Sequence, residues 1–154
     1  MIYPLDFYTQ YHQLFICDKN SSKETDEQTF WTEEASKSRL AVGDGILGAS
    51  LECYGPFKGE LVILDKKKDE IEYDEYDHVV EGGLEITSGV LQVLDCPNFS
   101  VELEIKLSNG IYRVRIYSSN LISVVGDSGD DYYRIEIWPD SDMQRKVLKQ
   151  YKSY

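Results

Sequence analysis

Residues 99–116 read Phe-Ser-Val-Glu-Leu-Glu-Ile-Lys-Leu-Ser-Asn-Gly-Ile-Tyr-Arg-Val-Arg-Ile. Apolar side chains occupy every second position from Phe99 to Leu107, and polar side chains lie between them. This alternation is typical of a strand that is buried on one face. Asn109-Gly110 is a preferred pair for a two-residue hairpin turn. The stretch therefore predicts a β-hairpin that turns at Asn109-Gly110.

The apolar register of this hairpin is consistent on both arms. Folding the chain at Asn109-Gly110 places Ile105 opposite Val114, on the face that we expect to point into the core. The predicted core residues of the hairpin are Leu103, Ile105, Leu107, Tyr112, Val114 and Ile116. On the opposite face the same register brings Glu104 to Arg115 and, less favourably, Lys106 to Arg113.

Most of the remaining chain also has the pattern of short strands. Further β-rich runs cover residues 8–17, 46–54, 60–64, 78–81, 84–87, 90–94 and 133–138. Gly55-Pro56, Gly82-Gly83 and Gly89 separate several of them. Aromatic side chains occur at both parities of residues 8–17, so we expect that run to be buried on both faces.

Two segments have helical signals. Thr32 is a suitable N-cap, and a helix is expected from there to about Val42, where Gly43 and Gly45 end it. Ser141 or Asp142 can cap a final helix over residues 141–152. Together these patterns predict a mainly β protein, an antiparallel β-sandwich of about eight strands with two peripheral helices. We expect one domain over residues 1–154, including the C-terminal helix.

The charge balance restricts the class of partner. The chain has 154 residues, with 28 Asp and Glu against 16 Lys and Arg, so its formal net charge is −12. A field of that sign repels nucleic acid and anionic membranes and attracts cationic proteins. We therefore expect no direct binding of DNA or RNA, no membrane association, and a basic protein as the partner.

The cysteines and the N-terminus indicate a cytoplasmic protein. Cys17, Cys53 and Cys96 are odd in number and far apart, as expected for buried free thiols in a reducing compartment. Residues 1–6 have neither the basic nor the apolar region of a signal peptide.

An acidic run between two predicted strands is the first candidate binding surface. Residues 65–77 read Asp-Lys-Lys-Lys-Asp-Glu-Ile-Glu-Tyr-Asp-Glu-Tyr-Asp. Such a run is explained either by a solvated loop or by an aromatic-containing surface that meets a basic protein. The predicted partner-binding residues are Glu70, Glu72, Tyr73, Asp74, Glu75, Tyr76 and Asp77, with Asp127, Asp130 and Asp131 as a second candidate group.

The sequence does not indicate catalysis. His12 and His78 have no Cys, His or carboxylate at a zinc-ligand spacing, and no glycine-rich stretch matches a phosphate or dinucleotide loop. The aspartates at 127, 130 and 131 offer oxygen ligands, but their spacing differs from that of an EF-hand loop. We expect no enzyme activity, no cofactor and no metal, with calcium at these aspartates as the open alternative.

Several short motifs carry a resemblance to a known family. Tyr11-His12-Gln13 with Phe15, and Trp31-Thr32-Glu33-Glu34-Ala35 followed by Ala41 and Asp44-Gly45, resemble the start of the competence protein J family. Residues 109–114 and 131–135 are similar to its Gly-x-Tyr hairpin and its late tyrosine-containing strand. The resemblance implies a bacterial inhibitor of the DNA-entry nuclease. The acidic run and the final basic segment lie outside it, and structural roles also explain the matched residues.

These observations favour an acidic, non-enzymatic protein that inhibits a nuclease by protein–protein binding. An immunity protein that neutralises a toxin nuclease would work by the same mechanism. The competing class is a small-ligand-binding or enzymatic β-sandwich whose acidity serves only solubility.

Overall fold

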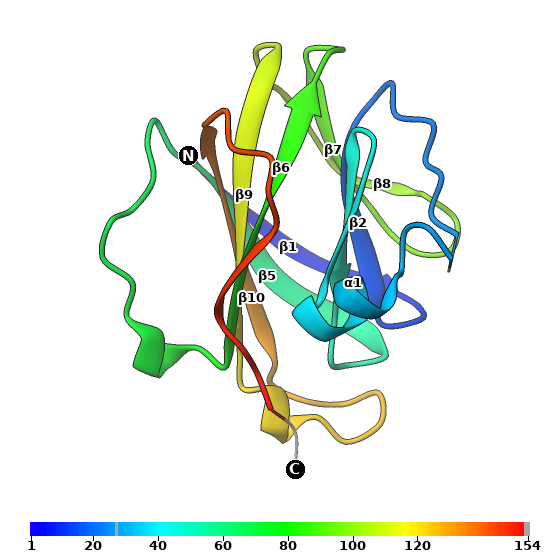
Figure 1. The fold of residues 1–154 in the computed structure, drawn as a ribbon. Coiled ribbons are helices and arrows are strands. Elements are labelled where there is room, and N and C mark those ends of the chain that lie inside the picture. The colour runs from blue at the N-terminus through cyan, green and yellow to red at the C-terminus, as the bar shows by residue number, and fades with distance from the viewer. Residues whose placement is uncertain (27, 153–154) are drawn as a thin grey trace.

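The computed structural model describes residues 1–26 and 28–152, and two β-sheets pack face to face in it (Figure 1). The strands are β1 (Ile2–Thr9), β2 (Gln13–Asp18), β3 (Leu40–Gly43), β4 (Ile46–Ser50), β5 (Gly55–Ile63), β6 (His78–Ile86), β7 (Val90–Leu94), β8 (Val101–Lys106), β9 (Gly110–Ser119), β10 (Tyr132–Pro139) and β11 (Lys146–Lys149). The helical segments are α1 (Glu33–Ser38) and the 3-10 turns η1 (Tyr73–Glu75) and η2 (Leu121–Ser123).

The two sheets have different sizes and share one core. The six-stranded sheet has the order β1-β5-β10-β9-β6-β11, and the five-stranded sheet has the order β3-β4-β2-β7-β8. Buried side chains of both sheets, such as Leu14, Leu61, Val114 and Ile137, form the core between them. The predicted mainly β sandwich is confirmed. One pairing, β10 with β5, is parallel, so the sandwich is not purely antiparallel.

The predicted hairpin at Asn109-Gly110 is wrong. β8 pairs with β7 in the five-stranded sheet, where Ile105 lies opposite Leu91. β9 pairs with β6 and β10 in the other sheet, where Ile116 lies opposite Val80 and Ile135. The predicted inward face is nevertheless correct, because all six apolar residues of the two strands belong to the core or pack against it. The alternation of apolar and polar residues specifies which face of each strand is buried. The predicted hairpin and the observed pairing bury the same face, so the alternation does not distinguish them.

The predicted C-terminal helix is also wrong. Residues 141–145 are extended and irregular, and β11 pairs with β6, where Val147 lies opposite Val80. The buried Arg113 donates through Nη1 to the carbonyls of Asp142 and Gln144, which a helix would use internally. The segment thereby covers an otherwise open edge of the six-stranded sheet.

The predicted helix after Thr32 begins as expected and ends early. Thr32 Oγ1 accepts a hydrogen bond from the backbone N–H of Ala35 at 3.1 Å, so it is the N-cap. Arg39 adopts a left-handed conformation with φ 63° and ends α1, and the residues up to Gly43 form β3. α1 lies against the five-stranded sheet (Figure 1).

The described chain contains eleven strands rather than about eight. Residues 8–17 are divided between β1 and β2, and β3 and β11 replace predicted helical segments. Gly82-Gly83 lies inside β6 instead of separating two strands. A Cβ atom at Gly82 would lie 2.8 Å from Leu40 Cδ2, and one at Gly83 would lie 2.5 Å from Met143 Cα. Both glycines therefore permit close packing on opposite faces of the strand.

β2 is the central strand of the five-stranded sheet and is buried on both faces. The predicted burial of residues 8–17 is thus correct for this strand and wrong for Tyr8, Tyr11 and His12, which are exposed. Leu14 and Ile16 face the main core, whereas Phe15 and Cys17 belong to a second buried cluster on the outer side of the sheet. No helix among the described residues is long and apolar enough to cross a membrane.

Candidate functional site

The acidic run forms a long connection between β5 and β6 that contains the η1 turn. The structure exposes five of its predicted site residues: Glu70, Glu72, Tyr73, Asp74 and Glu75. The connection stands out at one side of the molecule in Figure 1. These five residues are therefore available to a partner.

Two other predicted residues of the run have structural roles. The Tyr76 ring packs against the Tyr117 ring at 4.7 Å between centroids, and this burial raises the pKa of Tyr76. Asp77 Oδ2 accepts the backbone N–H of Leu121 at 2.9 Å. Tyr76 and Asp77 attach the run to β9 and to η2.

Backbone contacts attach the run at two more points. Arg115 Nη1 donates to the carbonyl of Lys68 at 3.1 Å, and Lys149 Nζ donates to the carbonyl of Tyr73 at 2.8 Å. The acidic side chains of the run are thus displayed on a backbone that the sheet and the C-terminal segment hold in place.

Beneath the run lies a buried ionic cluster that sequence analysis did not predict. Glu81 accepts from Arg113 Nε at 2.9 Å and from Arg115 Nε at 2.6 Å. The predicted partners of these arginines, Glu104 and Lys106, lie on β8 in the other sheet. Glu104 instead accepts from Gln92 Nε2 at 2.8 Å.

The cluster continues onto the neighbouring strand β10. Arg134 donates to Glu136 and to Glu60, and Glu136 accepts a hydrogen bond from the Tyr117 hydroxyl. Burial is the main cause of the raised pKa of Tyr117, so this hydroxyl stays protonated. Charged residues at alternate positions of β6, β9 and β10 were the sequence signal for this ionic cluster. The cluster could not be predicted from them, because the sequence does not show that these three strands are neighbours.

The second acidic group is divided by burial. Asp127 and Asp130 are exposed in the β9–β10 connection. Asp131 is buried, and its Oδ2 accepts from the Tyr133 hydroxyl at 2.8 Å and from the backbone N–H of Cys53 at 3.3 Å. Asp131 therefore holds this connection to the β4–β5 connection and to β10 instead of facing a partner. No group of three or more His, Cys, Asp or Glu side chains in the described part of the chain is placed to hold a metal ion.

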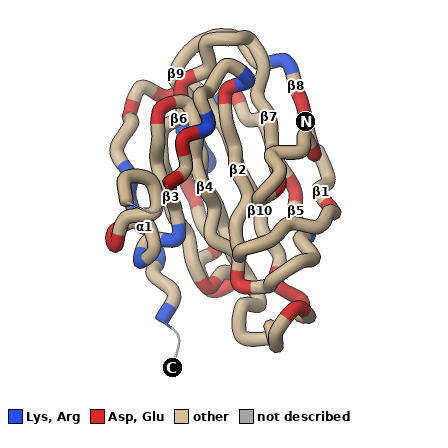
Figure 2. Tube along the Cα trace, turned by 90° about the vertical axis from the view of Figure 1, so that its right-hand side faces the viewer, with Lys and Arg blue, Asp and Glu red and all other residues tan. Residues whose placement is uncertain are grey.

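The two acidic segments approach each other at one end of the sandwich, because Asp77 in one contacts Leu121 in the other. The exposed apolar side chains Ile122 and Val125 lie in the second segment. Asp and Glu also occur along the strands and loops elsewhere on the Cα trace (Figure 2). Negative charge is therefore widespread, and these two segments combine it with exposed aromatic or apolar side chains.

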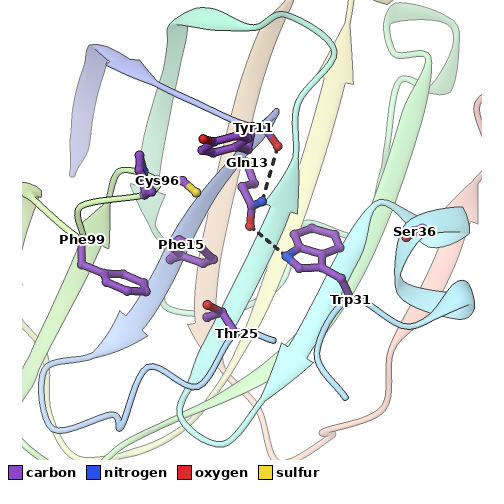
Figure 3. Close-up of a pocket in the computed structure, with 9 residues that line it drawn as sticks. Tyr11, Gln13, Phe15, Thr25, Trp31, Ser36, Cys96 and Phe99 are labelled. Carbon is purple, nitrogen blue, oxygen red and sulfur yellow. Dashed lines mark hydrogen bonds between the residues drawn. The ribbon is translucent and has the colours of Figure 1, made fainter. Parts of the chain in front are cut away.

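A pocket on the outer side of the five-stranded sheet is a further candidate site. Its volume is about 640 Å³, and its lining residues are Tyr11, Gln13, Phe15, Thr25, Trp31, Ser36, Cys96, Pro97 and Phe99. Trp31 Nε1 donates to Gln13 Oε1 at 2.8 Å, and Gln13 Nε2 donates to the Tyr11 carbonyl at 3.4 Å (Figure 3). The Tyr11–Phe15 and Trp31 motifs of the sequence thus meet at one site, which sequence analysis did not anticipate.

The two histidines contact backbone groups, and the three cysteines are buried and unpaired. His78 is fully buried, with Nε2 2.7 Å from the Ser38 carbonyl and Nδ1 accepting the backbone N–H of Tyr151. His12 is exposed, and its Nδ1 lies 3.2 Å from the Glu52 carbonyl. Burial raises the pKa of the Cys17 thiol to about 11, so Cys17 is a thiol at neutral pH.

No protein-family model matches the chain, and the sequences of curated proteins give no match either. Among solved structures, the chain is similar to ComJ from Bacillus subtilis, an inhibitor of the DNA-degrading activity of NucA. The superposition has a TM-score of 0.67 at 18% identity and covers 91% of this chain and 99% of ComJ.

The product of crocagin biosynthetic gene J is a second structural neighbour, with a TM-score of 0.58 and 13% identity. That superposition covers 91% of this chain and 97% of the neighbour. At such identities these similarities concern the fold: the chain has a ComJ-like fold along almost its whole length.

Proposed function

We propose that this protein is a non-enzymatic inhibitor of a nuclease and that it acts by binding a basic surface of that enzyme. The observation that carries the proposal is the similarity in fold to ComJ, which extends over 91% of this chain and 99% of ComJ. The motifs at Tyr11–Phe15 and Trp31–Gly45 support it independently, because they resemble the same family in sequence.

Electrostatics supplies a mechanism for the proposed inhibition. A nuclease binds phosphates in a basic cleft, and a protein with a formal net charge of −12 is attracted to such a surface. The exposed carboxylates of Glu70, Glu72, Asp74 and Glu75 are our first choice for the contact. Tyr73, between them, adds rigid aromatic contact area. Asp127 and Asp130 are the second choice.

The placement of reactive side chains supports a non-enzymatic role. Both ring nitrogens of His78 are engaged with backbone groups, and the Cys17 thiol is buried with a raised pKa. We also propose a bacterial cytoplasmic location, which the buried, unpaired thiols of Cys17, Cys53 and Cys96 support.

The test is inhibition of DNA degradation by purified nucleases. The panel includes a DNA-entry nuclease and a toxin nuclease with a basic cleft, each assayed on plasmid DNA with increasing amounts of this protein. We expect one class to be inhibited at a stoichiometric ratio, with a complex detectable by size-exclusion chromatography. Inhibition of the toxin nuclease alone would assign the protein to immunity. DNA degradation by this protein itself, or full activity of both nuclease classes with no complex formed, would contradict the proposal.

A further inference from the structure

We propose that the pocket lined by Tyr11, Phe15, Trp31 and Phe99 binds an arginine side chain presented by the basic protein partner. The inference rests on the proposed function, because it places an arginine of that partner at a contact face separate from the acidic run. The pocket lies on the outer side of the five-stranded sheet, whereas the acidic run lies over the outer side of the six-stranded sheet.

Aromatic rings from three separate segments form the walls of this pocket. Tyr11 and Phe15 come from the start of β2 and the turn before it, Trp31 precedes α1, and Phe99 lies between β7 and β8. Phe15 and Phe99 are in contact, with 5.1 Å between their ring centroids. In Figure 3, Tyr11, Trp31 and Phe99 surround the space next to Phe15. A volume of about 640 Å³ is ample for one long side chain.

The lining is preorganised by its own hydrogen bonds. Gln13 accepts the indole N–H of Trp31 through Oε1 and donates to the Tyr11 carbonyl through Nε2. This chain of contacts holds the Trp31 ring and the Tyr11 backbone relative to each other before any ligand arrives. A preorganised pocket loses less conformational entropy when it binds.

Left-handed backbone conformations occur at and beside the pocket. Tyr11, His12 and Phe99 have φ values of 58°, 57° and 55°, in the left-handed region that non-glycine residues rarely adopt. Tyr11 is 58% exposed, so its conformation does not bury its ring in this structure. Strain of this kind occurs preferentially at binding and catalytic sites.

The charge around the pocket favours a cation. None of the nine lining residues is charged. In the sequence, the exposed Glu24 and Asp26 flank Thr25, and the exposed Glu33 and Glu34 precede Ser36. The exposed Lys37 follows Ser36, so carboxylates outnumber ammonium groups beside these lining positions. The nearby Lys23 ammonium is held by the carbonyls of Lys19 and Ser21. A cationic group entering the pocket would therefore meet aromatic rings inside an acidic surround.

Arginine fits this environment better than other side chains. Its planar guanidinium stacks on aromatic faces, is less strongly hydrated than an ammonium group, and remains charged at every relevant pH. The hydroxyls of Thr25 and Ser36 and the Gln13 carbonyl oxygen are acceptors for its N–H groups. A neutral aromatic ligand would use the rings but would gain nothing from the surrounding carboxylates.

The direct test uses N-acetyl-arginine methylamide as the probe and its citrulline analogue as a neutral control of the same shape. Binding is followed through the indole N–H resonance of Trp31 by NMR, with the buried Trp138 as internal reference. We expect a saturable shift with the arginine probe and at least several-fold weaker binding of the citrulline analogue. Equal binding of the two probes, preferential binding of N-acetyl-phenylalanine methylamide, or no shift with any probe would overturn the proposal.

Two variants connect the pocket to the partner. Tyr11→Asn removes one ring and suits the left-handed backbone, and Tyr8→Thr removes an exposed tyrosine that does not line the pocket. We expect Tyr11→Asn to weaken the binding of both the arginine probe and the inhibited nuclease roughly 2- to 30-fold, which is the range for one cation–π contact. Tyr8→Thr should change neither affinity. If Tyr11→Asn proves unstable, Thr25→Lys, with Thr25→Gln as its neutral control, tests the same point by placing a cation in the lining.

The outcomes separate this inference from the proposed function. Inhibition of a nuclease that is unchanged by Tyr11→Asn and by Thr25→Lys would retain the inhibitor function and reject the pocket. Selective binding of the arginine probe in a protein that inhibits no nuclease would retain an arginine-binding pocket and reject the nuclease as its partner.

Discussion

The backbone N–H of Tyr151 donates to Nδ1 of His78 at 2.9 Å, which joins the C-terminal segment to the first residue of β6. The other ring nitrogen, Nε2, lies 2.7 Å from the Ser38 carbonyl, so the neutral ring satisfies both contacts by donating from Nε2 and accepting at Nδ1. Protonation of Nδ1 would remove the acceptor that Tyr151 uses. Burial accordingly lowers the pKa of His78 from 6.5 to about 4.

Stability should therefore fall as the pH is lowered from about 6.5 towards 4. In this range the unfolded chain binds a proton on His78 and the folded chain does not, so acid favours unfolding. The free energy of unfolding should fall by up to about 1.4 kcal/mol per pH unit. Urea unfolding of the wild type at pH 7 and pH 5 measures the change. His78→Gln keeps a donor and an acceptor without titrating, and it should lose much of this pH dependence. An identical slope in the variant would show that other groups cause it.

The pairing of Glu81 with Arg115 distinguishes the observed sheets from a hairpin between β8 and β9. Glu81→Gln should lower the free energy of unfolding by about 3–5 kcal/mol, because it removes the nearest carboxylate of two buried guanidinium groups; Asp142 and Glu136 remain only at 3.8 Å and 3.9 Å. Glu104→Gln should change it by about 0–1 kcal/mol, because the ion pair of Glu104 with Lys19 at 3.7 Å is exposed and a glutamine oxygen can still accept from Gln92 Nε2.

Double-mutant cycles with Arg115→Gln complete this test. We expect a coupling energy of about 0.5–3 kcal/mol between Glu81 and Arg115, and none between Glu104 and Arg115. Coupling of Arg115 to Glu104 would support the hairpin and contradict the observed topology.

Ile105 should contribute strongly to stability even though it lies on the edge strand β8. Its side chain belongs to the shared core, so Ile105→Ala should cost about 2–5 kcal/mol. Val101 on the same strand is 52% exposed, and Val101→Ala is the matched control, with an expected change within about 0.5 kcal/mol. Chemical denaturation measures both variants, and a loss at Ile105 as small as that at Val101 would mean that Ile105 does not belong to the core.

Asp131 should behave as a structural residue, unlike its neighbour Asp130. Asp131→Ala leaves the Tyr133 hydroxyl and the Cys53 N–H without their common acceptor, which should cost about 1–3 kcal/mol. Asp130→Ala, at an exposed position, should leave the thermal midpoint nearly unchanged. Circular dichroism measures the thermal midpoints of both variants. An unchanged midpoint in Asp131→Ala would return Asp131 to the candidate contact residues.

Charge reversal in the acidic run tests the proposed contact with a nuclease. In the triple variant Glu70→Lys, Glu72→Lys and Glu75→Lys, association should slow markedly while folding is retained, because these side chains are exposed. Wild-type association should also slow with salt, since the Debye length falls from about 10 Å at 0.1 M to about 3 Å at 1 M. Stopped-flow association rates give both results.

The double reversal Asp127→Lys and Asp130→Lys is the comparison for the second acidic segment. A slower rate in this variant, with unchanged binding of the triple variant, would move the contact from the acidic run to the β9–β10 connection.

The candidate site was predictable only where exposure follows from local sequence. A dense run of carboxylates such as Glu70 to Glu75 repels itself and remains in water whatever the fold. Asp131 has the same residue type as Asp130, but it is buried because Tyr133 in β10 and Cys53 in the β4–β5 connection supply donors to it. Local sequence does not distinguish these two aspartates.

The aromatic pocket was not predictable for a related reason. The motifs that contain Tyr11, Gln13 and Trp31 were identified in the sequence. Whether these side chains lie together depends on where β2, the segment before α1 and the turn at Phe99 lie in space. The contacts that form the site join residues 18 positions apart, as between Gln13 and Trp31, or much farther.

The sequence alone identified the mainly β character, the buried faces of β8 and β9, and the N-cap at Thr32, because each depends on the period of side chains along a few residues or on one local hydrogen bond. Strand partners, the extended C-terminal segment and the burial of Arg113, Arg115 and Glu81 depended on the assembled fold. A period of two specifies which face meets the core and is equally satisfied by any neighbour that buries that face. The choice of neighbour then follows from long-range contacts such as that between Glu81 and Arg115, which form only when β6 and β9 lie side by side.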